Sequence, residues 1–301
     1  MTWSYTKRQP PCIISGVPKS RIQAGQVGIR GGNGIEYALA VEGADVVSAT
    51  LASHGAATPA LPGVFGGYPG ATSCYEIVRK SGWKERAQKG SEIRSLADLG
   101  GEFERLPIKI ALEAREGDVI NCIVNNGGGY GDPIERLSES VVADLRDGKI
   151  TADVADRVYG VPTDQFGNSA ADAVKARRDA IRRERLSRAH KHSTHVAGIA
   201  RSTGSHAKGG GGRWAGLLDL KHSRDGLIAC CQHCSEELGP VGDDWRANTL
   251  SLEVAAKDIG YTRDIDHRFE FEQNDCPKCA ASLWLEARPR DGRTSRDFIL
   301  L

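Results

Sequence analysis

The chain has 301 residues, of which 40% are hydrophobic and 26% are charged, and its formal net charge at pH 7 is +1. This composition is ordinary for a globular protein of about two domains, and it excludes a largely disordered chain. Residues 1–11 are polar, and no apolar stretch is long enough for a signal peptide or a membrane span. We therefore expect a cytoplasmic protein with reduced thiols and no membrane partner.

The charge is distributed unevenly along the chain. Residues 213–301 carry 12 Lys and Arg against 16 Asp and Glu, a net charge of −4, whereas residues 1–212 carry 28 against 23, a net charge of +5. Nucleic-acid affinity depends on Lys and Arg that neutralise phosphates. The acidic C-terminal part is therefore expected to contact protein and not nucleic acid.

Residues 1–168 are punctuated by glycine and rich in predicted strands. Apolar and β-branched residues predict strands over residues 35–41, 45–51, 108–112 and 119–124, with a glycine turn inside each pair. We find no catalytic triad, no paired carboxylates in a plausible pocket and no HExxH helix in the sequence. No residue is therefore assigned a catalytic role.

Two short helices are predicted to follow these strands. Ser138 is the expected N-cap of a helix over residues 139–147 that stops at Gly148. Thr151 is the expected N-cap of a second helix, which ends at Gly160.

A third predicted helix, over residues 169–189, is strongly basic. One face is apolar and includes Val174 and Ile181. Arginines dominate the remaining surface: Arg177, Arg178, Arg182, Arg183, Arg185 and Arg188. Because they surround most of the circumference and no aromatic side chain lies between them, we expect contact with solvent or an acidic protein partner, not nucleic acid.

Two glycine clusters resemble phosphate-binding loops only superficially. Residues 28–34 precede a predicted strand, so they cannot aim a helix N-terminus at a pyrophosphate. Residues 125–133 follow a strand but lack the Gly-Lys-Ser/Thr ending, and Pro133 has no amide to donate. These glycines are expected to allow close backbone approach or a positive φ. Tyr130 and Asp132 are candidates for lining a substrate site; the alternative is a structural turn in which Asp132 caps local amides.

Residues 190–212 are predicted to form a flexible linker, because four consecutive glycines occupy positions 209–212. His190, His192, His195 and His206 are close enough in sequence to suggest a metal site. Their polar, glycine-rich setting favours an ordinary linker.

Two cysteine pairs near the C-terminus carry the most specific signal in the chain. Cys231 and Cys234 form one two-residue-spaced knuckle, and Cys276 and Cys279 form another after 41 intervening residues. Two such knuckles complete the four ligands of a closed structural zinc site. A disulfide or inert buried thiols are the alternatives, and a cytosolic setting disfavours the first. Cys230 and His233 lie beside the first knuckle as possible substitute ligands, although either would break the repeated spacing.

The predicted fold class is α+β. A strand-rich, glycine-punctuated domain with C-terminal helices occupies residues 1–189, a flexible linker occupies 190–212, and a small zinc-ribbon-like domain occupies 213–301.

The glycine motifs also resemble a known family. The matching segments are residues 30–37 (RGGNGIEY), 63–71 (GVFGGYPGA), 127–136 (GGGYGDPIER), 142–150 (VADLRDGKI) and 155–161 (ADRVYGV). In this order they resemble the C-terminal end of the hydantoinase B/oxoprolinase family, over about residues 26–189. The CPKC knuckle followed by LWLE at 283–286 looks like the small gamma subunit of acetone carboxylases.

The resemblance implies an ATP-dependent enzyme complex. Large subunits of this family work with a hydantoinase A-type partner that uses ATP to phosphorylate a carbonyl, enol or lactam oxygen, after which the substrate is carboxylated or hydrolysed. The family's catalytic divalent metal is bound by the N-terminal portion of the hydantoinase B-type chain, and the sequence departs from the family by starting shortly before the first matching motif. We therefore expect ATP and the catalytic metal on partner subunits, one of which carries the rest of the hydantoinase B-type fold.

Three functions remain open at this point. The favoured one is a non-catalytic or site-completing subunit of a ketone carboxylase of the acetone or acetophenone carboxylase type. The second is a subunit of an ATP-dependent hydantoinase or lactam hydrolase. The third is a zinc-ribbon adaptor without enzymatic activity.

Overall fold

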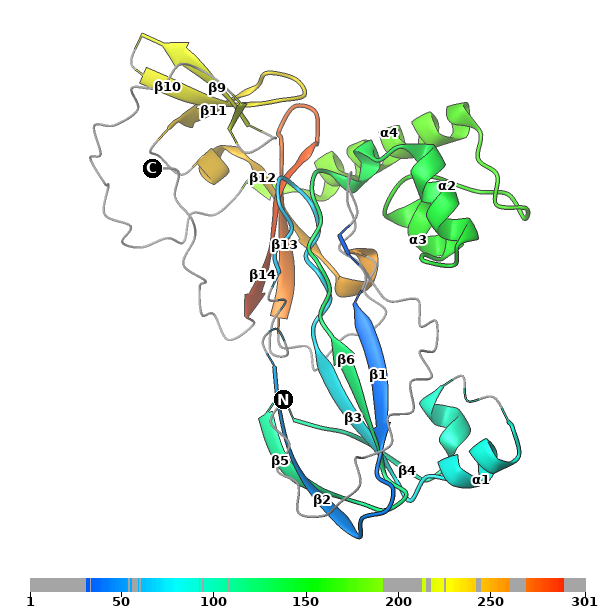
Figure 1. Cartoon of the computed structure of the whole chain (residues 1–301). Coiled ribbons are helices and arrows are strands. Elements are labelled where there is room, and N and C mark those ends of the chain that lie inside the picture. Colours follow the sequence, from blue (N-terminus) through cyan, green and yellow to red (C-terminus); the bar gives the residue numbers. More distant parts are fainter. Residues whose placement is uncertain are drawn as a thin grey trace. The chain divides into compact units, whose positions relative to one another are not determined.

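A computed structural model of the chain describes residues 31–32, 34–53, 55, 59, 61–91, 93, 95–107, 109–191, 213–214, 218–224, 226–241, 245–259 and 269–289 (Figure 1). These residues combine helices and strands, which confirms the predicted α+β class. Most of the predicted linker, including His192, His195 and His206, lies outside them.

The described chain divides into two compact units. The first contains residues from 33–60 and 71–126, and the second contains residues from 23–32, 61–70 and 127–301. Two glycine-rich segments that precede residue 71 thus belong to the same unit as the cysteine knuckles and the helices that follow residue 127. The sequence-based boundaries at 189 and 213 stay a prediction.

The first unit is built from antiparallel strands. Its strands are β1 (Ile35–Ala40), β2 (Val46–Ala52), β3 (Cys74–Arg79), β4 (Glu102–Arg105), β5 (Lys109–Arg115) and β6 (Val119–Val124). They form one sheet of order β1-β6-β3-β4 and a two-stranded sheet β2-β5, and α1 (Trp83–Gln88) follows β3. The four strands predicted in this region are therefore present.

The glycine turns in this unit do not make simple hairpins. β1 pairs with β6 and β2 pairs with β5, so the chain changes sheet at both turns. The amide of Val41 donates to Asp118 O (3.0 Å) and the amide of Gly117 donates to Val41 O (3.3 Å), which joins the two turns. The apolar core lies between the sheets and includes Leu51 and Ile120.

The second unit holds the three helices predicted from the sequence: α2 (Ser138–Arg146), α3 (Ala152–Arg157) and α4 (Ala171–Arg188). Thr151 caps α3, since its Oγ1 accepts from Val154 N at 3.1 Å. The prediction that Ser138 caps α2 is wrong: Leu137 is the N-cap residue, without a side-chain cap, and Ser138 is the first helical residue. Gly148 (φ +68°) and Gly160 (φ +62°) follow α2 and α3 as expected.

Two antiparallel sheets complete the second unit. The first has the order β11-β10-β9-β8, from β8 (Arg213–Trp214), β9 (Leu218–Ser223), β10 (Gly226–Cys231) and β11 (Glu237–Pro240). The second has the order β14-β13-β12-β7, from β7 (His190–Lys191), β12 (Leu250–Val254), β13 (Phe269–Asp275) and β14 (Ser282–Pro289). Among the described residues, the helices are too short or too polar to cross a membrane.

Candidate metal centre

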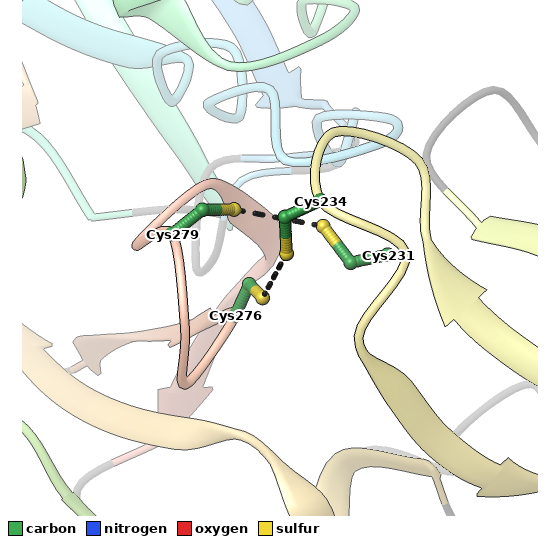
Figure 2. Close-up of side chains that lie close together, drawn as sticks. All are labelled: Cys231, Cys234, Cys276 and Cys279. Carbon is green, nitrogen blue, oxygen red and sulfur yellow. Dashed lines mark hydrogen bonds between the residues drawn. The ribbon is translucent and has the colours of Figure 1, made fainter.

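The four predicted cysteines come together at two hairpin turns. Cys231 is the last residue of β10 and Cys234 lies in the turn that follows it, whereas Cys276 and Cys279 lie in the turn between β13 and β14 (Figure 2). The Sγ atoms of Cys231 and Cys279 are 3.7 Å apart, those of Cys234 and Cys276 are 3.5 Å apart, and all four lie within 4.8 Å of one another. The cysteines of the described chain are free thiols, so the disulfide alternative is absent from the structure.

The two turns have the same backbone design. In each, the residue after the second cysteine donates its amide to the carbonyl of the first: Ser235 N to Cys231 O (2.8 Å) and Ala280 N to Cys276 O (3.0 Å). The amide of each first cysteine donates to a carbonyl five residues further along, at 2.8 and 2.9 Å. Ser235 (φ 61°) and Ala280 (φ 57°) are both left-handed, a conformation that non-glycine residues keep only where the surroundings impose it.

The thiol positions fit a tetrahedral metal ion. With metal–sulfur bonds of about 2.3 Å, as in zinc thiolate sites, the edge of a regular tetrahedron is about 3.8 Å. The observed sulfur separations of 3.5 and 3.7 Å are close to that edge. Four thiolates leave no open coordination position, so a metal bound here would stabilise structure and would not activate water.

The neighbouring thiol and imidazole remain outside this cluster. Cys230 is fully buried, and its Sγ lies 4.0 Å from Ile228 O, whereas His233 is exposed. Contacts from Cys276 and Cys279 lower the pKa of Cys231, and contact with Cys231 raises that of Cys279.

A small apolar core surrounds the cysteines. It includes Leu218, Leu238 and Leu283, with Phe65 packed against it from a glycine-rich segment. The guanidinium of Arg246 lies 5.4 Å from the ring centroids of both Trp245 and Trp284. Because this core is modest, a metal ion bound by the four cysteines would add stability to this part of the chain.

Three glycine-rich segments of the second unit, at residues 31–32, 61–70 and 127–133, pack backbone against backbone. The amide of Val64 donates to Gly129 O (2.7 Å), and the amide of Gly131 donates to Val64 O (2.9 Å). The amide of Gly127 donates to Gly32 O at 3.3 Å. We call these three segments the glycine cluster.

The need for glycine at position 128 is steric. A Cβ atom on Gly128 would lie 2.1 Å from the carbonyl oxygen of Pro62. The positive φ in this loop is found at Gly131 (φ +82°) and not at Gly128. Of the two predicted reasons for glycine, close approach thus applies to Gly128 and backbone conformation applies to Gly131.

Asp132, in the third segment of the glycine cluster, forms a buried ion pair with Arg185. It is 1% exposed, and its two oxygens accept from Arg185 Nη1 (2.6 Å) and Nη2 (3.0 Å). The amides of Ser282 (2.8 Å) and Ile134 (3.2 Å) also donate to it. Burial would raise the pKa of Asp132, but the charge of Arg185 and these hydrogen bonds hold it below its ordinary value.

The bonds of Asp132 include the local amide cap that the structural alternative expects. Tyr130, the other candidate, is 44% exposed and packs edge-to-face on Phe65, with ring centroids 4.8 Å apart. A role of Tyr130 and Asp132 in lining a substrate site stays a prediction.

The burial of Arg185 was not predicted from the sequence. Arg185 was expected on the solvent-facing remainder of α4, yet it is only 5% exposed. The signal was its spacing, because Arg185 lies four residues after Ile181 and eleven after Val174, on the same face of the helix.

Asp275, directly before Cys276, is a second buried acid that the sequence analysis did not single out. Burial raises its pKa to about 7, against the opposing charge of Arg185. Gln273 Nε2 donates to its Oδ1 at 2.8 Å, and Tyr68 Oη donates to Gln273 Oε1 at 3.3 Å.

A cavity of about 170 Å³ lies beside α4, lined in part by Tyr68, Ile181 and Leu252. Three lining arginines already bind carboxylates: Arg157 with Asp258 (2.8 Å), Arg177 with Asp156 (3.1 Å) and Arg188 with Glu184 (3.3 Å). The positive charge around the cavity is therefore largely neutralised within the chain.

Fold and site together define an α+β protein with a four-thiol centre, and its N-terminal part is similar to a known family. The model of the hydantoinase B/oxoprolinase family matches residues 8–133. This match over residues 8–133 confirms the resemblance to that family predicted from the glycine motifs. The likeness of the cysteine part to a gamma subunit stays a prediction.

Two curated relatives match part of the chain. Caprolactamase subunit beta from Pseudomonas jessenii is 36% identical over 82 residues, which cover 27% of this chain and 14% of that protein. Acetone carboxylase alpha subunit from Xanthobacter autotrophicus is 30% identical over 149 residues, which cover 42% of this chain and 19% of that protein. The chain thus spans less than a fifth of the length of either relative.

Solved structures of the same two kinds of enzyme are also similar. A nucleotide-free acetone carboxylase has a TM-score of 0.46 and 26% identity, covering 55% of this chain and 24% of that chain. An ATP-dependent caprolactamase from Pseudomonas jessenii has a TM-score of 0.38 and 24% identity, covering 52% and 24%.

Proposed function

We propose that the chain is a subunit of an ATP-dependent, multi-subunit enzyme of the hydantoinase B/oxoprolinase type. The observation that carries this proposal is the family match over residues 8–133. Both curated relatives are enzyme subunits, and this chain spans only a small part of either. In the proposed complex, a hydantoinase A-type subunit uses ATP, and another chain carries the rest of the hydantoinase B-type fold and the catalytic divalent metal.

The cysteine centre has a structural role in this proposal. Cys231, Cys234, Cys276 and Cys279 hold one zinc ion that joins the β10–β11 and β13–β14 turns. Zinc suits a set of four thiolates, and a saturated tetrahedral site has no position for a substrate. The chain therefore completes or stabilises an active site without supplying its metal chemistry.

Ketone carboxylation is the favoured reaction, because the CPKC knuckle and the LWLE segment after it resemble the acetone carboxylase gamma subunit. An ATP-dependent lactam hydrolase is the second candidate, and the match to a caprolactamase subunit favours it. A zinc-ribbon adaptor without enzymatic activity is the third.

Reconstitution separates the three candidates. The full chain is purified alone and together with the proteins encoded beside it, and each sample is assayed for ATP hydrolysis with acetone and bicarbonate or with caprolactam. We expect no turnover by the chain alone and ATP-dependent carboxylation by the assembled complex. Caprolactam hydrolysis would favour the second candidate, a monodisperse chain that joins no such complex would favour the adaptor, and turnover by the isolated chain would contradict the proposed role.

A further inference from the structure

The side chain of Arg185 joins the cysteine centre to the glycine cluster. Its Nη1 donates to the carbonyl of Ala280 (3.0 Å), the left-handed residue directly after Cys279, and both Nη atoms bind Asp132. Ala280 itself donates to Cys276 O, so the carbonyl that Arg185 binds belongs to the second knuckle.

A second connection runs in parallel through Ser282, at the start of β14. Its amide donates to Asp132 Oδ2 (2.8 Å), and its Oγ donates to Gly66 O (3.1 Å) in the 61–70 segment. The side chains of Arg185 and Asp132 are 5% and 0% exposed, and Ser282 is fully buried. Water is therefore poorly placed to replace either connection.

We infer that the buried Arg185–Asp132 ion pair couples metal binding at the four cysteines to the conformation of the glycine cluster. The second knuckle keeps Ala280 left-handed, and a metal ion that binds Cys276 and Cys279 fixes this turn. In sites of this kind the free energy of metal binding is used to fold the surrounding chain. The positions of Ala280 O and Ser282 N, and with them both connections to Asp132, depend on that turn.

Metal binding would therefore stabilise the glycine cluster, whose three segments are distant from the cysteines in sequence. Asp132 is the next-to-last residue of the 127–133 segment, whose amides bind the 31–32 and 61–70 segments. This inference rests on the metal site proposed above and not on the identity of the substrate. Because coupling between two sites is reciprocal, loosening the ion pair must also weaken metal binding.

The test measures both directions of the coupling on the full chain. Hydrogen exchange is followed by mass spectrometry for zinc-loaded protein and for protein stripped by a chelator. We expect removal of zinc to accelerate exchange at least about fivefold in the peptides that contain Val64, Gly129 and Gly131, in addition to the knuckles. Faster exchange confined to residues 231–236 and 276–281 would overturn the inference.

Zinc affinity, measured by chelator competition, tests the reverse direction. Arg185→Met should weaken zinc binding about tenfold, within the usual range of coupling between sites. Arg182→Met is the matched control, because Arg182 lies one helical turn earlier and binds Glu135 at 2.6 Å with both side chains partly exposed. We expect the control to bind zinc as the unmodified chain does.

If Arg185→Met fails to fold, Asp132→Asn is the second variant to test. This substitution keeps the size of the Asp132 side chain and removes its charge. It should weaken zinc binding in the same direction. Zinc affinity within about twofold of the unmodified chain in a folded variant would overturn the coupling alone. An unmodified chain that binds no zinc would overturn the metal site and the coupling together.

Discussion

At the scale of single residues, Cys276 is one of the four proposed zinc ligands. Cys276→Ser replaces a soft thiolate with a hydroxyl that binds zinc poorly, so the variant should retain less than about half an equivalent of zinc. Elemental analysis of freshly purified protein measures this. Cys230→Ala is the control, because Cys230 is buried beside the first knuckle but lies outside the cluster. Equal zinc contents in the two variants would contradict the four-cysteine assignment.

Gly128 gives a steric prediction. Gly128→Ala places a Cβ atom against the Pro62 carbonyl, where neighbouring backbone would have to move, so we expect a loss of about 1–3 kcal/mol in the free energy of unfolding. Gly32→Ala is the matched control in the same cluster, since its Cβ would meet no atom within 4 Å. Urea denaturation of both variants checks the difference, and an equal effect would argue against tight packing at Gly128.

At the scale of elements, the two short helices differ in how they begin. Thr151→Ala removes the hydroxyl that accepts from Val154 N and should cost about 1 kcal/mol of unfolding free energy. Ser138→Ala should change the free energy of unfolding by less than about 0.5 kcal/mol, because Ser138 lies inside α2 and caps nothing. A larger loss for Ser138→Ala than for Thr151→Ala, measured by chemical denaturation, would contradict these helix starts.

The same elements show which parts of the fold could be predicted from sequence patterns. Strands β1, β2, β5 and β6, the ends of α2 and α3 at glycine, and the cysteine knuckles follow from local patterns, because alternation, capping and ligand spacing involve neighbouring residues. Pairing partners were not predictable in this way. β1 pairs with β6 and not across its own glycine turn, since register depends on contacts between distant segments.

Arg185 illustrates the same limit at the candidate site. Its place on the apolar face of α4 was readable from helical spacing, but its partners Asp132 and Ala280 come from two other regions of the chain, as does Ser282, whose amide binds Asp132. A buried arginine is tolerated only where such partners neutralise its charge and accept its hydrogen bonds. The residues that join the cysteines to the glycine cluster therefore become visible only in the folded chain.

At the scale of the whole molecule, the two units should respond differently to metal removal. The core that includes Leu51, Ile77 and Ile120 lies entirely in the first unit, whereas the core around the cysteines lies entirely in the second. A ligand that binds only folded protein stabilises it by about 4 kcal/mol at a thousandfold excess over its Kd. Only the second unit gains this stabilisation from zinc.

Calorimetry of the full chain, with and without a chelator, checks this prediction. A free-energy change of about 4 kcal/mol corresponds to a Tm shift on the order of 10 °C for a unit of this size. We expect that shift in one transition, assigned to the second unit by hydrogen exchange in β10 and β13, while exchange in β3 and β6 keeps its original temperature dependence. A chelator that lowers both transitions equally would mean that the two units unfold as one, and a chelator without effect on either would remove the structural role of the metal.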